Sequence, residues 1–443
     1  MRANLRPGLR ILATIDTAIG FCYHTNKLFN SNGVSCMYAE RIARPMSTSW
    51  LGKWCNKDVI KVVTGIRRCG KTMLFELFKD ELRTKGISEQ QIISINFESP
   101  LLPDFPTWRT AWEFIKAKVD PGLKTYVFLD EVQLVPEFER LVDGIYSLKN
   151  FDVYITGSNA KFLSGELATF LTGRYVEIRL QPLSFAEYSS LFPERHSDDI
   201  MRNYMTFGGF PFAALLDANS QSQNDYLSGI LDTIVYKDII ARNGYRDVAT
   251  LRRLIKFLAD NIGNLYSVNK IVGILKNEGL SVPHATLDAY TESLCETYLF
   301  DRVSRYDIKG RDILRTNAKY YLADTGLRRL LLADKPSDQG RILENVIYLE
   351  LKRRYHEVFV GTLGANEIDF VAFENAVPHY YQVALTTREE STLLRELAPL
   401  KAIRDNHPKT LLTLDRDPPA NFDGIRKINA IDFLLAPKSI ETL

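Results

Sequence analysis

The fold that we expect is decided by the stretch Val62-Val63-Thr64-Gly65-Ile66-Arg67-Arg68-Cys69-Gly70-Lys71-Thr72. From Gly65 onward it matches the pattern G-x-x-x-x-G-K-[ST], a glycine-rich loop whose backbone N–H groups face phosphate oxygens. In such a loop the lysine reaches the β- and γ-phosphates, and the final hydroxyl is a ligand of Mg²⁺. We therefore predict a phosphate-binding loop made of Gly65, Ile66, Arg67, Arg68, Cys69, Gly70, Lys71 and Thr72.

The residues on both sides of this loop fit its expected setting. Lys61-Val62-Val63 has the β-branched composition of a strand, and the apolar residues between Met73 and Phe78 have the spacing of a helix. A helix that begins at the loop adds the positive end of its dipole to an anion site. The loop is therefore predicted to join a buried strand to a helix.

Two acidic residues follow another buried strand. The apolar run 126–129 is typical of a central strand, and Asp130 and Glu131 come directly after it. We expect Asp130 to bind Mg²⁺ and Glu131 to orient or deprotonate the attacking water. Together with the loop, these carboxylates predict an ATPase that uses ATP and Mg²⁺.

Three further side chains are candidates for contact with the nucleotide. Ser158 and Asn159 follow a predicted strand at 153–156, where either would bond to the γ-phosphate or the water, although both residue types also cap helices. Arg174 follows a helical stretch at 160–171 and is either an arginine finger or an ordinary surface arginine. An arginine finger offered to a neighbouring subunit would imply oligomerisation.

The composition is that of a folded protein with several domains. The chain has 443 residues, 45% of them hydrophobic and 25% charged. Its net charge of +2 predicts no partner, so any nucleic-acid surface must be local. The 5 cysteines lack C-x-x-C spacing, which indicates neither zinc nor a disulfide framework and favours the cytoplasm. Because no apolar run reaches about 18 residues, we expect no membrane partner.

Composition and periodicity divide the chain into successive parts. Strands alternate with helices after Trp50, which predicts a mostly parallel sheet with helices on its faces. Further on, amphipathic helices precede a hairpin, as in a winged helix. The parts are an extension at 1–48, either untranslated before a start at Met46 or disordered, an ATPase core at 49–190, a helical lid at 191–245, a winged helix at 246–333 and a second α/β domain at 334–443.

The predicted hairpin combines basic and aromatic residues, which suits phosphates and bases. A nucleic acid is therefore one candidate partner, and an unknown protein is the other, because winged helices also dock proteins. The basic residues are Arg302, Arg305, Lys309, Arg311, Arg315 and Lys319, the acids are Asp301, Asp307 and Asp312, and the aromatic residues are Tyr306, Tyr320 and Tyr321.

From Trp50 to Leu443 the chain resembles a group of bacterial and archaeal ATPases with an AAA-type core and a C-terminal domain of unknown function. The resemblance rests on residues 64–72, 128–133, 156–160, 172–174, 182–185 and 367–370. It implies an α/β P-loop ATPase fold of the AAA type. Within that fold, Glu131, Lys71, Asn159 and Arg174 are the candidate catalytic residues.

The last part, 334–443, resembles the restriction-endonuclease type of fold. That resemblance implies an acid on the first helix, an Asp on the second strand and an acid-x-Lys on the third strand. Glu344 and Asp369 match the first two, whereas Gln382 and Ala384 stand where the acid and the lysine should be. An amide and a methyl group cannot replace them, so we expect an inactive domain that survives as a binding module.

The function we predict is ATP hydrolysis that couples nucleotide state to a nucleic-acid or protein partner in the cytoplasm. One alternative is a nucleotide-gated regulatory binding module without significant turnover. The other is an ATP-controlled nuclease. Glu344 and Asp369 favour a nuclease, whereas the absence of a lysine at Ala384 is evidence against it.

Overall fold

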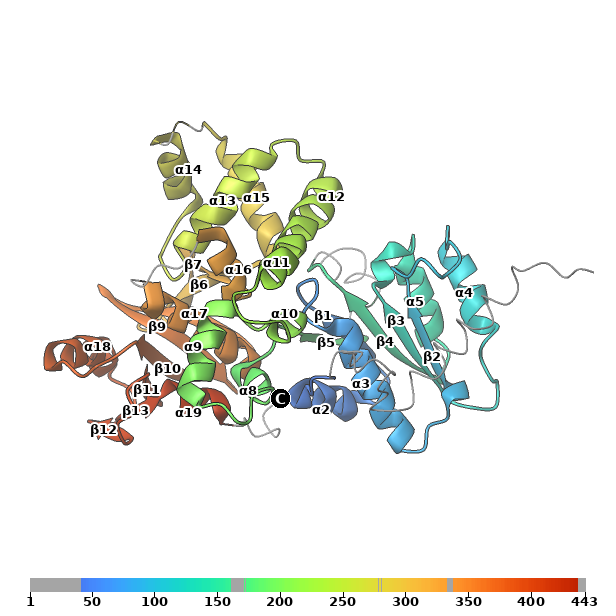
Figure 1. The fold of residues 1–443 in the computed structure, drawn as a ribbon, viewed down its shortest axis with the longest axis horizontal. Coiled ribbons are helices and arrows are strands. Elements are labelled where there is room, and N and C mark those ends of the chain that lie inside the picture. The colour runs from blue at the N-terminus through green and yellow to red at the C-terminus, as the bar shows by residue number, and fades with distance from the viewer. Residues whose placement is uncertain are drawn as a thin grey trace, which may run out of the picture. The chain divides into compact units, whose positions relative to one another are not determined.

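The computed structural model describes residues 41–160, 171, 173–277, 279, 281–332 and 338–436. From Ile42 onward these belong to one compact unit, drawn in Figure 1. Most of the helix predicted at 160–171, residue 172 and the side chain of Arg315 lie outside the described residues.

The first sheet is parallel throughout and has the strand order β2-β3-β4-β1-β5. The prediction of a parallel α/β core is confirmed. Because β1 lies between β4 and β5, the loop after β1 is next to the end of β4, and β3 follows. The strands are β1 (Ile60–Thr64), β2 (Ile92–Asn96), β3 (Thr125–Asp130), β4 (Phe151–Gly157) and β5 (Tyr175–Arg179).

Helices cover both faces of this sheet, because neighbouring residues of its strands point to opposite sides. Val63 and Phe128 pack with α2 and α3 on one face, whereas Val62 and Leu129 pack with α4 and α5 on the other. The central strands β1 and β3 are buried along their whole length, as strands covered on both faces are, whereas β2 and β5 at the edges are partly exposed. The helices are α2 (Pro45–Trp54), α3 (Lys71–Thr84), α4 (Trp108–Lys116) and α5 (Phe138–Tyr146), and the short 3₁₀ turns are η1 (Glu89–Gln91) and η2 (Val132–Leu134).

The folded chain begins earlier than we expected. Helix α2 starts at Pro45, and Arg44 before it is buried. Its guanidinium donates hydrogen bonds to the carbonyl of Cys69 at 3.1 Å and of Gln181 at 2.6 Å. Residues 42–48 therefore belong to the folded unit, in contrast to the predicted extension at 1–48.

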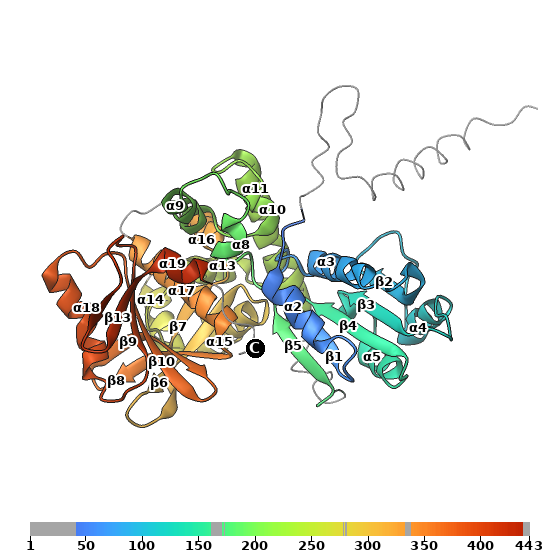
Figure 2. The ribbon, with the colours of Figure 1, turned by 90° about the horizontal axis from the view of Figure 1, so that it is seen from below.

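The segment predicted as a helical lid is helical in the structure (Figure 2). Its η3 differs from the others because it is a π-helix that continues α11 directly. The segment consists of α9 (Ser197–Phe207), α10 (Pro211–Ala214), α11 (Gln221–Thr233), η3 (Ile234–Ile240) and α12 (Ala241–Asn243), and α8 (Phe185–Ser189) precedes it at the end of the predicted core.

The three helices and the hairpin that we predicted after this segment are present, but the hairpin is not a free wing. Residues 305–307 of its first strand pair in parallel with residues 360–362 of a strand farther along the chain. Lys319, Tyr320 and Tyr321 are buried, so they are not available for phosphates or bases. The elements are α13 (Val248–Asp260), α14 (Val268–Asn277), α15 (His284–Glu296), β6 (Phe300–Asp307), β7 (Asp312–Leu322) and α16 (Thr325–Leu332).

The hairpin therefore completes a second, mixed sheet with the order β12-β13-β11-β10-β9-β8-β6-β7. Helix α17 packs on one face with Phe370 and Ala372, and α18 packs on the other with Ile368 and Val371. The elements are α17 (Gln339–Arg354), β8 (Glu357–Leu363), β9 (Asn366–Glu374), β10 (Val377–Ala384), α18 (Glu390–Ala402), β11 (Lys409–Thr413), β12 (Ala420–Phe422), β13 (Ile425–Asn429) and α19 (Ala430–Leu435).

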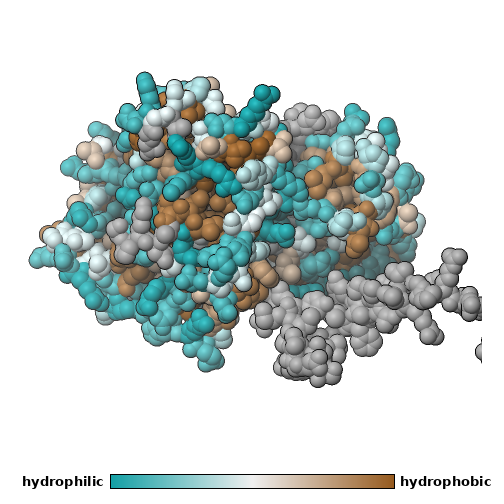
Figure 3. Space-filling view, turned by 45° about the horizontal axis from the view of Figure 1, so that its top comes forward, coloured by the Kyte–Doolittle hydropathy of each residue, from teal (hydrophilic) through white to brown (hydrophobic). Residues whose placement is uncertain are grey.

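No helix within the described ranges is both long and apolar enough to cross a membrane. On the face drawn in Figure 3, hydrophilic residues surround several hydrophobic areas. Exposed apolar side chains of the helical segment include Phe212 and Tyr236.

Candidate functional site: the phosphate loop and its acidic neighbours

The phosphate loop requires glycine at both ends of its motif. Gly65 and Gly70 have φ angles of 142° and 105°, which side chains rarely allow. A Cβ atom on Gly65 would lie 2.0 Å from the carbonyl oxygen of Leu180. The loop is thus a tight backbone turn ahead of α3, the geometry in which N–H groups and a helix N-terminus can face an anion.

Lys71 is the first residue of α3, and its side chain folds back over the loop. Its Nζ donates a hydrogen bond to the carbonyl of Gly65 at 3.1 Å and lies 3.5 Å from Oε1 of Glu131. Lys71 is buried. The structure therefore brings together the predicted cation and the predicted general base.

Thr72 and Asp130 offer oxygen atoms for Mg²⁺. The hydroxyl of Thr72 donates to Oδ2 of Asp130 at 2.5 Å, and Thr156 donates to the other carboxylate oxygen. Burial raises the pKa of Asp130, and the hydrogen bonds from Thr156 and Thr72 partly oppose that rise. A hydroxyl and one carboxylate, completed by substrate phosphates, form the ligand set that Mg²⁺ commonly uses, so these residues fit the metal.

Glu131 has a strained backbone that aims its side chain at Lys71. Its φ and ψ angles are 51° and 45°, in the left-handed region, and its N–H donates to the Thr156 hydroxyl at 2.8 Å. Gln133 donates to Oε2 of Glu131 at 2.5 Å. The carboxylate of Glu131 is thus held between Lys71 and Gln133.

Two buried polar atoms near these groups have no hydrogen-bond partner in the described part of the chain. They are the hydroxyl of Ser158, at the end of β4, and Oε1 of Gln133. Buried polar atoms are normally paired, so both mark positions where a ligand or water fits. Asn159, which follows β4, is also buried.

Arg67 and Arg68 lie in different environments. Arg68 is exposed, with a φ angle of 66°, whereas Arg67 is buried. Arg67 donates from Nε and Nη2 to the two carboxylate oxygens of Asp238, both at 3.0 Å, and from Nη1 to Glu98 at 3.0 Å. Although burial lowers the pKa of Arg67, the hydrogen bonds and charge of Asp238 and the charge of Glu98 raise it overall.

Cys69 is buried within the loop. Burial raises the pKa of its thiol, even though Lys71 and Arg44 lower it. A neutral thiol is a poor nucleophile, so Cys69 fills space under the loop and contributes its backbone.

The structure does not bring Arg174 to the phosphate loop. Arg174 precedes β5, and its carbonyl accepts a hydrogen bond from Ile60 at the start of β1, whereas the loop follows the end of β1. Its side chain pairs with Asp143 at 2.6 Å and is half exposed. Within one chain Arg174 lies at the opposite edge of the sheet.

Sequence reasoning missed four residues that contact the site: Arg44, Glu98, Gln133 and Asp238. Gln133 lies within the acidic motif and was accessible from its spacing to Glu131. Arg44, Glu98 and Asp238 reach the loop only through tertiary packing, and no local pattern indicates that.

The second cluster of charged residues lies on the mixed sheet. Nζ of Lys319, on β7, lies 2.9 Å from Glu344, 2.8 Å from Glu367 and 3.9 Å from Asp369. The ammonium of Lys319 therefore lies among three carboxylates, although no lysine stands at position 384. Burial and the charge of Glu344 raise the pKa of Asp369 to about 8, although Lys319 lowers it.

This cluster does not fit a metal ion. No group of three or more His, Cys, Asp or Glu side chains in the described part of the chain is placed to hold one. The Lys319 ammonium lies among the carboxylates, and Oε1 of Gln382 accepts from the N–H of Asp369 at 3.3 Å. The cluster is therefore a buried ion-pair network between the hairpin and the rest of the sheet.

Two known families match successive parts of the chain. Residues 57–189 match the family described as an AAA domain, and residues 198–338 match a domain of unknown function (DUF8612). The first range contains the phosphate loop, Asp130 and Glu131. The second contains Asp238 and the hairpin.

Two relatives extend over nearly the whole chain. An uncharacterized protein of Haemophilus influenzae is 37% identical over 404 residues, which are 90% of this chain and 100% of the relative. The chain belongs to its family. A second uncharacterized protein, from Methanocaldococcus jannaschii, is 27% identical over 427 residues, 89% of this chain and 92% of the relative.

Residues 57–189 of this chain form an AAA-type ATPase domain, and nucleotide binding follows from it. Among solved structures, the Walker-type ATPase of Pyrococcus abyssi is 16% identical, with a TM-score of 0.46 over 68% of this chain and 97% of that one. A likeness of that size says nothing of function.

Proposed function

We propose that this protein binds ATP with Mg²⁺ at the phosphate loop, hydrolyses it, and uses the reaction to change its contacts with a partner. The observation that carries the proposal is the convergence of Lys71, Thr72, Asp130 and Glu131 at one edge of the parallel sheet. Ligands of such sheets bind at the carboxyl ends of the strands, where these residues lie.

Each residue has a chemical task in this proposal. The ammonium of Lys71 and the loop N–H groups attract the phosphates. Thr72 and Asp130 would hold Mg²⁺, which supplies positive charge to the phosphate oxygens when it is bound. Glu131 accepts a hydrogen bond from the attacking water, and Gln133 keeps the carboxylate in place.

Lys71 and Glu131 neutralise each other before the nucleotide arrives. Phosphate oxygens compete with Glu131 for the lysine, because they bring a larger negative charge. Glu131 is then available to the water. In this proposal the Ser158 hydroxyl and Asn159, both buried, contact the γ-phosphate or that water.

The test is phosphate release by wild type, Glu131→Gln and Lys71→Ala. We expect Glu131→Gln to bind ATP but to release phosphate about 100-fold more slowly or worse, because it loses the base. We expect Lys71→Ala to lose binding. The control is Glu137→Gln, on an exposed residue that pairs with Arg140. Binding without release by the wild type would favour the nucleotide-gated regulatory module instead.

The partner in this proposal contacts the exposed part of the β6–β7 hairpin. Arg302, Lys309 and Arg311 are exposed there, and Asp312 is the exposed acid beside them. This local positive charge favours a nucleic acid over a protein partner. Arg305 is less available, because its Nε donates to the Thr362 hydroxyl at 3.1 Å.

Charge reversal tests the nucleic-acid partner. In Arg302→Glu/Arg311→Glu we expect weaker DNA or RNA binding and a slope of log K against log salt that is smaller by about 2. Fluorescence anisotropy across a salt series measures both, with Arg140→Glu, on the exposed surface of α5, as the control. Equal affinities of the double variant and the control would instead indicate a protein partner.

We propose that the C-terminal sheet binds rather than cleaves. Gln382 and Ala384 lack the acid and the lysine of a nuclease, and the Lys319 network does not fit a metal. The residues at positions 382 and 384 and the Lys319 network thus both support a C-terminal sheet that does not cleave nucleic acid.

A further inference from the structure

The π-helix η3 joins the helical segment to the phosphate loop. It covers Ile234–Ile240 and follows α11 without a break. π-Helical turns are rare and often occur at functional positions, because their wider backbone spacing leaves the helix less stable. Asp238, on this turn, is 3% exposed.

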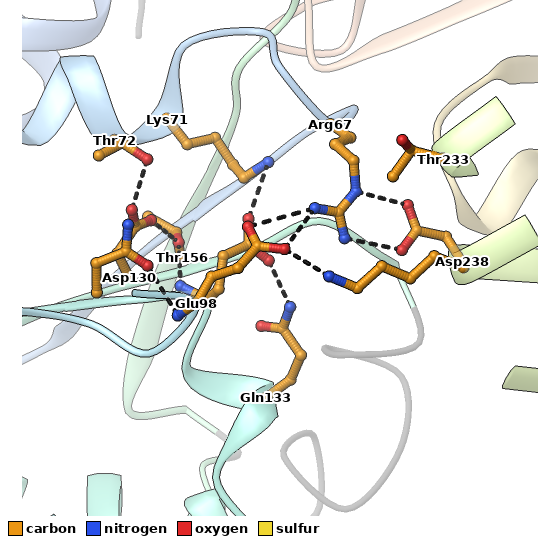
Figure 4. Close-up of polar contacts among 12 residues, drawn as sticks. Arg67, Lys71, Thr72, Glu98, Asp130, Gln133, Thr156, Thr233 and Asp238 are labelled. Carbon is orange, nitrogen blue, oxygen red and sulfur yellow. Dashed lines mark hydrogen bonds and ion pairs between the residues drawn. The ribbon is translucent and has the colours of Figure 1, made fainter. Parts of the chain in front are cut away.

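Asp238 is buried because it binds the phosphate loop. Both of its carboxylate oxygens accept hydrogen bonds from Arg67, at 3.0 Å each. A planar guanidinium and a carboxylate joined in this way form a strong and directional contact. Figure 4 shows Arg67 pointing from the loop to Asp238.

Two more charges complete a network across three segments. Glu98, after β2, accepts from Arg67 at 3.0 Å and from Lys237, next to Asp238, at 2.6 Å. Arg67 and Lys237 carry two positive charges, and Glu98 and Asp238 carry two negative ones. The network is therefore neutral without a ligand.

A triphosphate would disturb this balance. It places several negative charges on the loop that carries Arg67, close to the carboxylates of Asp238 and Glu98. Arg67 already donates from Nε, Nη1 and Nη2 to those carboxylates, so phosphate oxygens compete with them for its positive charge and can reach the second N–H of Nη1 and Nη2.

We infer that Arg67 and Asp238 form a nucleotide-sensitive link, which ATP binding opens and which thereby releases η3. The link rests on the proposed function, because ATP must bind at the loop. Arg67 is a positioning residue: it transmits occupancy of the loop to residues 198–338, which contain η3 and the basic hairpin.

ATP binding and the contact between Arg67 and Asp238 must affect each other equally in free energy, so the contact can be tested by measuring ATP affinity. If ATP opens the link, then a variant without it binds ATP more tightly, because nucleotide no longer competes with Asp238. Asp238→Asn removes the charge but keeps the size, and Glu98 still compensates Arg67. Asp232→Asn is the matched control, because Asp232 lies on α11 and forms a half-exposed pair with Arg252.

The experiment combines ATP affinity with hydrogen exchange on the full chain. In wild type we expect ATP with Mg²⁺ to raise exchange of residues 234–240. In Asp238→Asn we expect high exchange without nucleotide and ATP affinity that is higher by about 5-fold or more. Arg67→Lys keeps the charge but loses the two-point contact, so its exchange should also rise without nucleotide.

Two results would overturn the link. One is wild-type exchange at 234–240 that ATP leaves unchanged although ATP binds. The other is ATP affinity of Asp238→Asn equal to that of Asp232→Asn. Failure of the wild type to bind ATP at all would overturn the proposed function as well, which distinguishes the two failures.

Discussion

Single residues at the nucleotide site are held in costly conformations or environments. Glu131 has a φ angle of 51°, and Arg68 has one of 66°, both in the left-handed region. Such conformations cost of order 1–3 kcal/mol each and persist where the surroundings enforce them. For Glu131 the surroundings are Thr156, Gln133 and Lys71, all within the candidate site.

Asp324 is also in an unfavourable environment, because burial disfavours its ionised carboxylate. It is buried and accepts hydrogen bonds from the N–H groups of Gly209, at 2.6 Å, and Gly326, at 2.8 Å. A Cβ atom on Gly208 would lie 2.0 Å from Oδ1 of Asp324, so the carboxyl fixes the break between α9 and α10. Burial raises the pKa of Asp324 to about 7, although these N–H groups lower it.

This shift predicts a pH dependence of stability. Between the ordinary pKa of 3.8 and the folded value of about 7, the folded state binds the proton more tightly, so the free energy of unfolding falls as pH rises. Asp369 contributes in the same direction, with a folded pKa of about 8. In Asp324→Asn we expect a shallower fall, measured by urea unfolding between pH 5 and 8. Equal slopes in wild type and variant would contradict this role of Asp324.

At the scale of elements, the nucleotide-binding strands could be predicted because their signal is local. The apolar runs before Gly65 and after Thr125 needed no partner to be recognised, and the motif named Lys71, Thr72, Asp130 and Glu131. The structure brings these residues together.

The hairpin shows what local patterns leave out. Its two strands were predicted, but its parallel pairing with β8 depends on residues far along the chain. The same long-range pairing buries Lys319, which its sequence neighbours had placed on a basic surface. The Arg67 contact with Asp238 was missed for the same reason, because no periodicity links the two.

We expect the ion pairs of Lys319 to contribute to the free energy of unfolding. Lys319→Met leaves the mostly buried carboxylate of Glu344 without its compensating charge, whereas Glu367 is 40% exposed, and we expect a loss of about 3–5 kcal/mol in unfolding free energy. Lys309→Met, at the exposed turn, should change it by less than about 0.5 kcal/mol. Equal stability of the two variants would contradict this structural role of Lys319.

The same network predicts that the C-terminal sheet does not cleave DNA. Plasmid DNA incubated with the wild type and Mg²⁺ should stay intact. Cleavage by the wild type that is lost in Asp369→Ala would contradict this prediction.

In the whole molecule, one nucleotide site contacts the helical segment that contains η3, and the β6–β7 hairpin belongs to the second sheet. The AAA domain contains the phosphate loop, and the domain of unknown function contains Asp238. The hydrogen bonds between Arg67 and Asp238 therefore join the two domains. The hairpin of the second family domain is in turn part of the C-terminal sheet. A change at the phosphate loop therefore has a continuous structural route to the basic hairpin.

Phosphate release by the purified full chain with ATP and Mg²⁺, compared with release by Glu131→Gln, tests the claim that the phosphate loop hydrolyses ATP. We predict release by the wild type and by Glu137→Gln, and retained ATP binding with at least about 100-fold slower release by Glu131→Gln. Equal release by wild type and Glu131→Gln, or none by the wild type with or without DNA or RNA, would contradict the claim.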